Sequence, residues 1–255
     1  MRIIVLGKSP AWQDTDGACS GYLVQEDCAT VLLDCGCGVF SKLRRYQDYR
    51  DIDAVVISHL HADHVLDLVP YASALTYGPR QQERPARPRL FVPEAGREAL
   101  RRVCGGSGMP EDHVERAFDL RAYSPEDVLE VGALRARLHS VPHYLPTCAV
   151  DVASADGGGR FTYGADTGPS DDLVRFAEGT DLLMLEATLP APESEGPRGH
   201  LTPAEAGEHG ARAHVGRLVL THISDELDEQ WARAEAERTF GAPVDIAREG
   251  AVYTV

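Results

Sequence analysis

Three histidines and an aspartate lie within six residues, in the segment His59-Leu60-His61-Ala62-Asp63-His64. The segment directly follows an apolar run, residues 54–57, that is typical of a buried strand. Imidazole and carboxylate groups bind zinc and related divalent cations, and histidines two positions apart can reach one ion from an extended loop. Asp63 and His64 then face a second position as the chain turns into a helix beginning near Val65. This density of ligand types predicts a metal site.

Further ligand-type side chains follow other apolar runs. His143 comes after the alternating segment 134–141, Asp166 comes after 161–163, and His222 comes after 218–220. In α/β proteins, functional side chains lie where the chain leaves the carboxyl ends of strands. The candidate metal ligands are therefore seven side chains at strand ends: His59, His61, Asp63, His64, His143, Asp166 and His222.

The elements that must position these side chains are short β-branched runs and segments with apolar residues at helical spacing. We expect strands at residues 3–6, 22–24, 29–33, 54–57, 90–92, 134–141, 161–163, 182–185 and 218–220, and helices at 39–49, 95–103, 111–118, 170–178, 203–214 and 228–240. Thr202, Pro203 and Glu205 form a capping-box pattern at one helix start. Residues 78–89 lack periodicity and predict an exposed loop. This mixture favours an α/β layered fold.

Composition narrows the function classes. The 255 residues carry 25 Lys and Arg against 40 Asp and Glu, a net charge of −15, which disfavours general nucleic-acid binding. Six cysteines without a CxxC pair predict reduced thiols. The sequence has no apolar run long enough to cross a bilayer, and its first apolar run is too short for a signal peptide. We therefore expect a cytoplasmic protein without membrane contact.

The order of these features resembles the metallo-β-lactamase-fold hydrolases, in particular the ribonuclease Z-like phosphodiesterase branch. Besides HxHxDH, the resemblance rests on LDCG at 33–36, VPH at 141–143, GADTG at 164–168, LEAT at 185–188, GHLT at 199–202 and THI at 221–223, so it covers nearly the whole chain. It implies a four-layer αβ/βα sandwich, and we expect residues 1–255 to form a single domain in which 78–89 is an excursion.

The resemblance also divides the ligands between two ions. It implies that His59, His61 and His143 bind the first ion, that Asp63, His64 and His222 bind the second, and that Asp166 bridges them. Zinc suits the imidazole-rich set, while manganese and iron also accept the carboxylate oxygens. Two such ions make a bridging hydroxide available near neutral pH and bind the attacked phosphoryl group. Asp63 can also orient the attacking water, and Asp34 is expected to accept backbone hydrogen bonds nearby.

His200 and Glu186 match a proton-donating histidine–carboxylate pair of the same family. A phosphodiester leaving group departs as an alkoxide unless it is protonated, and a histidine held by a carboxylate can supply that proton. Leu201 stands where the family more usually has serine. The alternative interpretation is that His200 only marks the start of a helix.

The spacing bears on the substrate. Only 22 residues separate His143 from Asp166, which leaves no room for the Gly/Pro-rich arm that grips tRNA in tRNA-processing members of the family. Together with the acidic charge, this disfavours pre-tRNA and favours a small phosphodiester, with a cyclic nucleotide such as cAMP as the leading hypothesis.

Several alternatives stay open. One is an RNA 3′-end processing endonuclease of the ribonuclease Z type, and another is a lactonase or thioester hydrolase that uses the same metal site. A mononuclear iron enzyme that oxidises sulfur and a metal-stabilised binding protein without activity are two more. The Glu186–His200 pair disfavours the carbonyl substrates, and the complete second ligand set disfavours the mononuclear enzyme. Because dimers are common in the family, a second copy of the chain is a further candidate partner.

Overall fold

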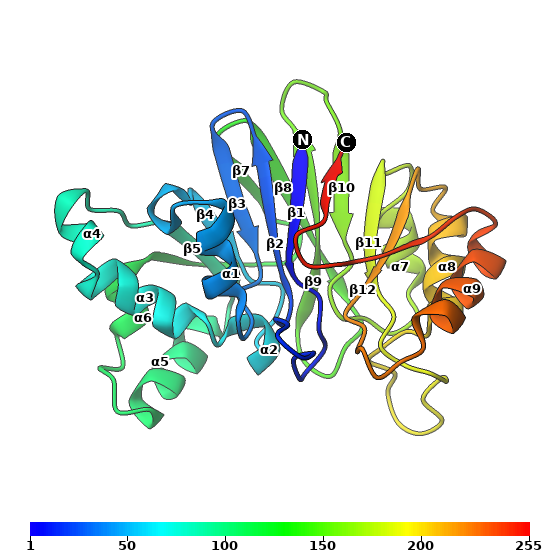
Figure 1. The fold of residues 1–255 in the computed structure, drawn as a ribbon, viewed down its shortest axis with the longest axis horizontal. Helices are drawn as coiled ribbons and strands as arrows, with labels where there is room; N and C mark the ends of the chain where they lie inside the picture. Colours follow the sequence, from blue (N-terminus) through cyan, green and yellow to red (C-terminus); the bar gives the residue numbers. More distant parts are fainter.

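Two seven-stranded mixed sheets face each other in the computed structural model, which describes residues 1–255 (Figure 1). The first sheet, in the order β14-β1-β2-β3-β4-β5-β6, contains β1 (Arg2–Gly7), β2 (Gly21–Glu26), β3 (Ala29–Leu33), β4 (Ala54–Val56), β5 (Arg89–Pro93), β6 (Asp119–Tyr123) and β14 (Val252–Thr254). The second, in the order β13-β12-β11-β10-β9-β8-β7, contains β7 (Val128–Val131), β8 (Leu134–Val141), β9 (Thr147–Ser154), β10 (Arg160–Tyr163), β11 (Leu182–Glu186), β12 (Leu218–Thr221) and β13 (Asp245–Ile246).

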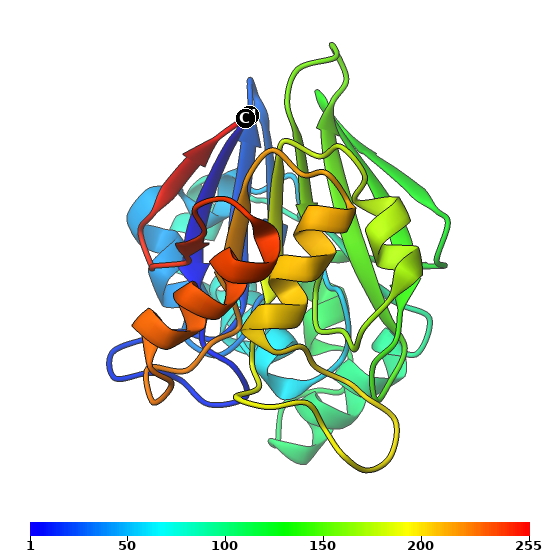
Figure 2. The same ribbon diagram turned by 90° about the vertical axis from the view of Figure 1, so that its right-hand side faces the viewer.

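The helices cover the outer faces of the two sheets, as Figures 1 and 2 show from two sides. The first half of the chain forms α1 (Val39–Tyr46), a 3₁₀ turn (Tyr49–Asp51), α2 (Ala62–Val65), α3 (Leu68–Tyr77), α4 (Pro79–Glu83), α5 (Gly96–Gly106) and α6 (His113–Ala117). The second half forms α7 (Asp171–Phe176), α8 (Pro203–Arg212) and α9 (Glu229–Phe240). The resulting order of layers, helix, sheet, sheet and helix, confirms the expected αβ/βα sandwich. None of the helices combines the length and the apolar character that crossing a membrane requires.

Alternation along the strands explains the layers. In β1, Ile3 and Val5 join a cluster of 27 buried residues that fills the space between the sheets, whereas Ile4 and Leu6 pack under the helices of the first half. Successive strand residues point to opposite faces, so a strand that is buried on both sides must be apolar at every position. Both sheets contribute to the central cluster. This shared core supports the interpretation of residues 1–255 as one domain, which stays a prediction.

Strand direction brings the candidate ligands together. Strands β3, β4, β5 and β6 run parallel in the first sheet, and β10, β11 and β12 run parallel in the second. Their carboxyl ends therefore share one edge of each sheet, the edge at which α2 lies (Figure 1). The segments that follow β4, β8, β10 and β12 at this edge carry all seven predicted ligands, of which Asp63 and His64 lie in α2.

Some expected elements differ in the structure. The loop expected at 78–89 contains the short helix α4, which Pro79 begins because its fixed φ suits a first helical turn. The helix expected to begin near Val65 is divided in the structure into the short α2, which ends at Val65, and α3, which begins at Leu68. Strands β6, β7, β9, β13 and β14 were not expected. The capping box of α8 is confirmed, since Thr202 and Glu205 exchange hydrogen bonds.

Candidate active site

Two groups of ligand-type side chains meet at the shared edge, and Asp166 belongs to both. The first group is His59, His61, His143 and Asp166, and the second is Asp63, His64, Asp166 and His222. Within each group, one ligand atom per residue lies within 4.8 Å of all the others. The structure thus brings together all seven side chains singled out in the sequence, with contributions from both sheets.

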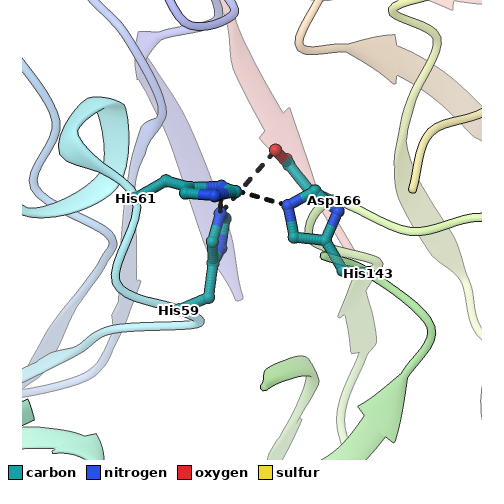
Figure 3. A group of neighbouring side chains, drawn as sticks. All are labelled: His59, His61, His143 and Asp166. Carbon is teal, nitrogen blue, oxygen red and sulfur yellow. Dashed lines mark hydrogen bonds and ion pairs between the residues drawn. The ribbon is translucent and has the colours of Figure 1, made fainter. Parts of the chain in front are cut away.

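In the first group, three histidine nitrogens converge (Figure 3). His61 Nδ1 lies 3.1 Å from His59 Nε2 and 3.1 Å from His143 Nε2. Asp166 Oδ2 lies 3.8 Å from His59 Nε2. Burial lowers the pKa of all three histidines. Their rings are therefore neutral near pH 7 and have lone pairs available for a cation.

The second group is more acidic and fully buried. His222 Nε2 lies 3.1 Å from Asp63 Oδ2 and 3.3 Å from Asp166 Oδ2, and His64 Nε2 lies 3.3 Å and 3.5 Å from the same two oxygens. Burial alone would raise the pKa of Asp63, but the hydrogen bond with His222 and the nearby charge of His64 hold it well below its usual range. Burial alone would lower the pKa of His64, but the carboxylates of Asp166 and Asp34 raise it well above its usual range. The same negative field that holds a proton here attracts a metal cation.

Outer hydrogen bonds set the tautomer of four of the histidines. Their Nδ1 atoms lie 2.7 to 3.0 Å from oxygen atoms outside the two groups: His59 from Ser58 Oγ, His64 from Asp34 Oδ2, His143 from Gly199 O and His222 from Thr188 Oγ1. In the neutral ring Nδ1 therefore carries the hydrogen, and Nε2 keeps its lone pair for an ion. The imidazoles are oriented for metal binding by groups that bind no metal themselves.

Asp34 accepts hydrogen bonds from several segments that surround the candidate ligands. Besides His64, its carboxylate accepts hydrogen bonds from Ser58 N at 2.7 Å, from Ser58 Oγ at 2.8 Å and from Tyr163 OH at 3.0 Å. The backbone hydrogen bond expected for Asp34 is thus present, while the tyrosine from the opposite sheet was not expected. Asp34, Ala165 and His222 all adopt left-handed φ values, of 57°, 55° and 49°. Such strain in non-glycine residues clusters at functional sites.

Two buried polar atoms without hydrogen-bond partners indicate that these residues fit a divalent metal ion. His64 Nε2 and Asp166 Oδ1 are buried and have no hydrogen-bond partner. A buried polar atom without a partner costs about 1–3 kcal/mol, so such atoms are rare unless a ligand satisfies them. Both atoms point into donor sets of imidazole nitrogen and carboxylate oxygen, which suit zinc, manganese or iron.

His200 and Glu186 form a pair beside both groups. His200 Nδ1 lies 2.8 Å from Glu186 Oε1, and the His200 ring centroid lies 5.0 Å from that of His143 and 5.7 Å from that of His222. Burial alone would lower the pKa of His200, but the hydrogen bond to Glu186 and its charge raise the pKa to about 9. Glu186 is fully buried and also accepts hydrogen bonds from Thr167 N, Thr188 and Leu201 N. His200 is therefore a protonated imidazole at neutral pH, held in a fixed orientation.

A cavity of about 550 Å³ lies beside the loop that carries His59 and His61. Leu60, which separates His59 from His61, lines it together with Tyr123, Leu145, Pro146 and Cys148. Leu60, Leu145 and Pro146 belong to the two loops that carry His59, His61 and His143, and the ends of β5 and β6 complete the wall. A cavity of this size is large enough for a small organic ligand.

Comparison with known families shows to which family the chain belongs. The family described as a β-lactamase superfamily domain matches residues 29–223, which include every candidate ligand. The chain belongs to the β-lactamase superfamily. It is 32% identical over 257 residues to an uncharacterized protein of Mycobacterium leprae, covering 100% of this chain and 89% of the relative.

Two further relatives match nearly the whole chain and have more informative names. The probable metallo-hydrolase YhfI of Bacillus subtilis is 29% identical over 253 residues, covering 99% of each chain, and its crystal structure matches with a TM-score of 0.88, 28% identity and coverage of 99% and 98%. Ribonuclease Z of Haloarcula marismortui is 28% identical over 301 residues, covering 98% of this chain and 95% of the relative. The protein is a metal-dependent hydrolase of the metallo-β-lactamase fold and of its ribonuclease Z-like branch.

Proposed function

We propose that the protein is a phosphodiesterase that hydrolyses a small or cyclic phosphodiester, with a cyclic nucleotide such as cAMP as the leading candidate. The observation that carries the proposal is the His200–Glu186 pair beside both ligand groups. A phosphodiester leaves an alkoxide that needs a proton, and a protonated imidazole next to the reacting centre can donate it.

The proposal assigns two divalent ions, zinc by preference, to the two groups. The first would be held by His59, His61 and His143, the second by Asp63, His64 and His222, and Asp166 would be available to both. Such a pair would supply a nucleophile derived from water near neutral pH and neutralise charge on the phosphoryl group.

The remaining steps fall to the side chains themselves. His200 donates its proton to the leaving oxygen, and Glu186 keeps the imidazole oriented and stabilises its positive charge. Asp63, held as a carboxylate, orients the attacking water. The neutral rings of the first group contribute lone pairs without adding positive charge, so the site keeps its attraction for cations.

Three observations support a small substrate. The chain between His143 and Asp166 forms only β9, a tight turn and β10, so no arm extends from it toward a large RNA. The net charge of −15 repels extended polyanions. The cavity lined by Leu60 and Leu145 adds room for an organic group beside the loops that carry His59, His61 and His143.

An RNA endonuclease of the ribonuclease Z type is the second candidate. It is favoured by the ribonuclease Z relative, whose name identifies a class of enzymes that cleave phosphodiester bonds. The alignment with that relative is 301 positions long against 255 residues here, so the relative carries segments that this chain lacks. The homodimer and the cytoplasmic location expected from the sequence stay predictions.

Metal content per chain, measured together with hydrolysis of bis(p-nitrophenyl) phosphate, tests the proposal. Two metal ions and turnover that a chelator abolishes are expected, after which cAMP, other cyclic nucleotides and short RNAs separate the two candidates. Substitution of His200→Ala should retain both ions and lower turnover of an unactivated diester by roughly 100-fold. One iron per chain without diester turnover would contradict the proposal and direct attention to sulfur substrates.

A further inference from the structure

The segment before His200 contains a carboxylate to which no role has been assigned. Residues 191–197 are all exposed to solvent except Glu193, which is half-buried. An acidic side chain that turns inward from an otherwise exposed loop must find donors there, because a buried carboxylate without hydrogen bonds is costly. The hydrogen-bond partners of Glu193 therefore identify the residues that hold this loop in place.

Glu193 accepts hydrogen bonds from the backbone of the proton donor itself. Its Oε2 accepts from Gly199 N at 2.8 Å and from His200 N at 3.4 Å. Its Oε1 accepts from Tyr144 OH. One carboxylate thus joins the residue that follows the ligand candidate His143 to the two residues that end the loop at His200.

Gly199 links the Glu193 carboxylate to the first ligand group. Its N–H binds Glu193, and its carbonyl oxygen accepts the hydrogen of His143 Nδ1 at 2.7 Å. The ring of Tyr144 packs so closely on Gly199 that an added Cβ would overlap the ring atoms. Glu193, Tyr144 and Gly199 form a clamp, and the clamp fixes the carbonyl that orients His143.

We propose that Glu193 is a positioning residue, which sets the orientation of both His200 and His143 through the Gly199 backbone. The His200 part rests on the proposed function, whereas the His143 part concerns metal binding alone. Hydrogen bonds to a carboxylate are stronger than neutral ones, so their loss frees the loop. A displacement of the reacting groups by about 1 Å can lower a rate by roughly 100-fold. Loss of an outer hydrogen bond to a metal-binding histidine weakens metal affinity by roughly 10- to 100-fold.

The test compares Glu193→Ala with Glu193→Gln and with the matched control Glu195→Ala. Glu195 lies two positions along the same loop and is exposed, so its substitution should change nothing. Zinc affinity is measured by competition with a chromophoric chelator, which requires no turnover. Hydrolysis is measured on bis(p-nitrophenyl) phosphate and on diphenyl phosphate, whose phenolate leaving group depends more strongly on a proton donor.

We expect Glu193→Ala to weaken zinc binding by roughly 10-fold and, in zinc-saturated protein, to lower kcat on diphenyl phosphate by 10- to 100-fold. The loss on bis(p-nitrophenyl) phosphate should be smaller, and KM should stay near its wild-type value. Glu193→Gln keeps an acceptor for Gly199 N and should restore most of both properties. Tyr144→Phe, which removes one contact of Glu193, should give an intermediate loss.

Unchanged zinc affinity in Glu193→Ala would overturn the role toward His143. An equal loss of kcat on the two esters would overturn the role toward His200, because a merely loosened fold does not distinguish leaving groups. If the wild-type protein binds zinc but hydrolyses neither ester, the proposed function fails, and the comparison of zinc affinities still decides the role of Glu193. A folding defect in Glu193→Ala would be recognised by its thermal unfolding, and Glu193→Gln then carries the comparison.

Discussion

His64 lies among three carboxylates, those of Asp34, Asp63 and Asp166, and has access to no water that could screen them. Charges in such a buried place interact far more strongly than on the surface. Without a cation, the imidazole must carry a proton to offset them, as its raised pKa indicates. The balance of charge around His64 thus favours either a proton or a bound cation at the second ligand group.

Substitution of Asp166→Ala should therefore lower metal content and hydrolysis together, since this residue belongs to both groups. Metal analysis after gel filtration and a diesterase assay check the two effects. Asp156→Ala, at an exposed turn, is the matched control and should keep both properties. A full metal complement with retained activity in Asp166→Ala would contradict the dinuclear assignment.

The His200–Glu186 pair predicts a specific pH dependence. A proton donor with a pKa of about 9 is fully protonated at pH 7 and loses its proton as the pH rises through 9. Glu186→Gln removes the charge that raises this pKa, so the fall in kcat on the alkaline side should move toward the ordinary histidine value near 6.5. Rate profiles from pH 6 to 10 on an unactivated diester check this expectation. An alkaline limb that does not move would mean that another group titrates there.

The candidate ligands could be predicted from the sequence because HxHxDH is dense in groups that bind metals. Their hydrogen-bond partners could not, since hydroxyl and carbonyl oxygens occur throughout the chain. Gly199 O and Thr188 Oγ1 lie 56 and 34 positions away from the histidines that they orient. Glu193 was missed for the same reason, as only the folded loop turns it inward.

At the level of elements, the loop after β3 packs directly on α2. Cys35 N donates to His64 O at 2.8 Å, and a Cβ added to Gly36 would overlap the carbonyl oxygen of Asp63. The backbone of the metal-binding turn is therefore fixed by a neighbouring loop that approaches too closely for any residue but glycine.

Gly36→Ala should accordingly displace α2 and yield protein that is less stable and poor in metal. Urea unfolding and metal analysis measure the two effects. Gly106→Ala is a matched control at the end of α5, where an added Cβ meets nothing within 4 Å. It should be neutral or stabilising by about 0.5–1 kcal/mol, because alanine suits a helix better than glycine. Normal metal content in Gly36→Ala would show that α2 tolerates the displacement.

Elements with a clear local signal were predictable, and those defined by their neighbours were not. The capping-box pattern predicted the first residue of α8 correctly. Strand β9 is buried on both faces and so lacks alternation, and β13 and β14 are too short to give a pattern. The arginines between positions 80 and 102 pair with nearby acidic side chains or carbonyl oxygens, as is typical of a solvated surface.

At the level of the whole molecule, each ligand group draws on both sheets. His59 and His61 come from the first half of the chain, whereas His143, Asp166 and His222 come from the second. An ion bound here connects the two sheets at one edge, while the central cluster connects them along their faces. Metal binding and global stability are therefore linked.

Removal of the metal should lower the temperature of unfolding. A ligand present at about 100 times its Kd stabilises the folded state by about 2.7 kcal/mol, which corresponds to about 5–10 °C for a chain of this size. Differential scanning calorimetry with and without a chelator measures the shift. In Asp166→Ala the chelator should cause little further change, and an equal shift in both proteins would indicate that the chelator acts elsewhere.

The spread of the ligand groups along the chain also sets the order of events during protein synthesis. Asp63 and His222 are 159 positions apart, and the first cannot meet the second until nearly all of the sandwich has left the ribosome. A nascent chain that ends before His222 presents three histidines and Asp166 but only part of the acidic group. On the two-ion proposal, the second ion would therefore bind only to a chain that has been synthesised beyond His222, so its uptake would be a late step of maturation.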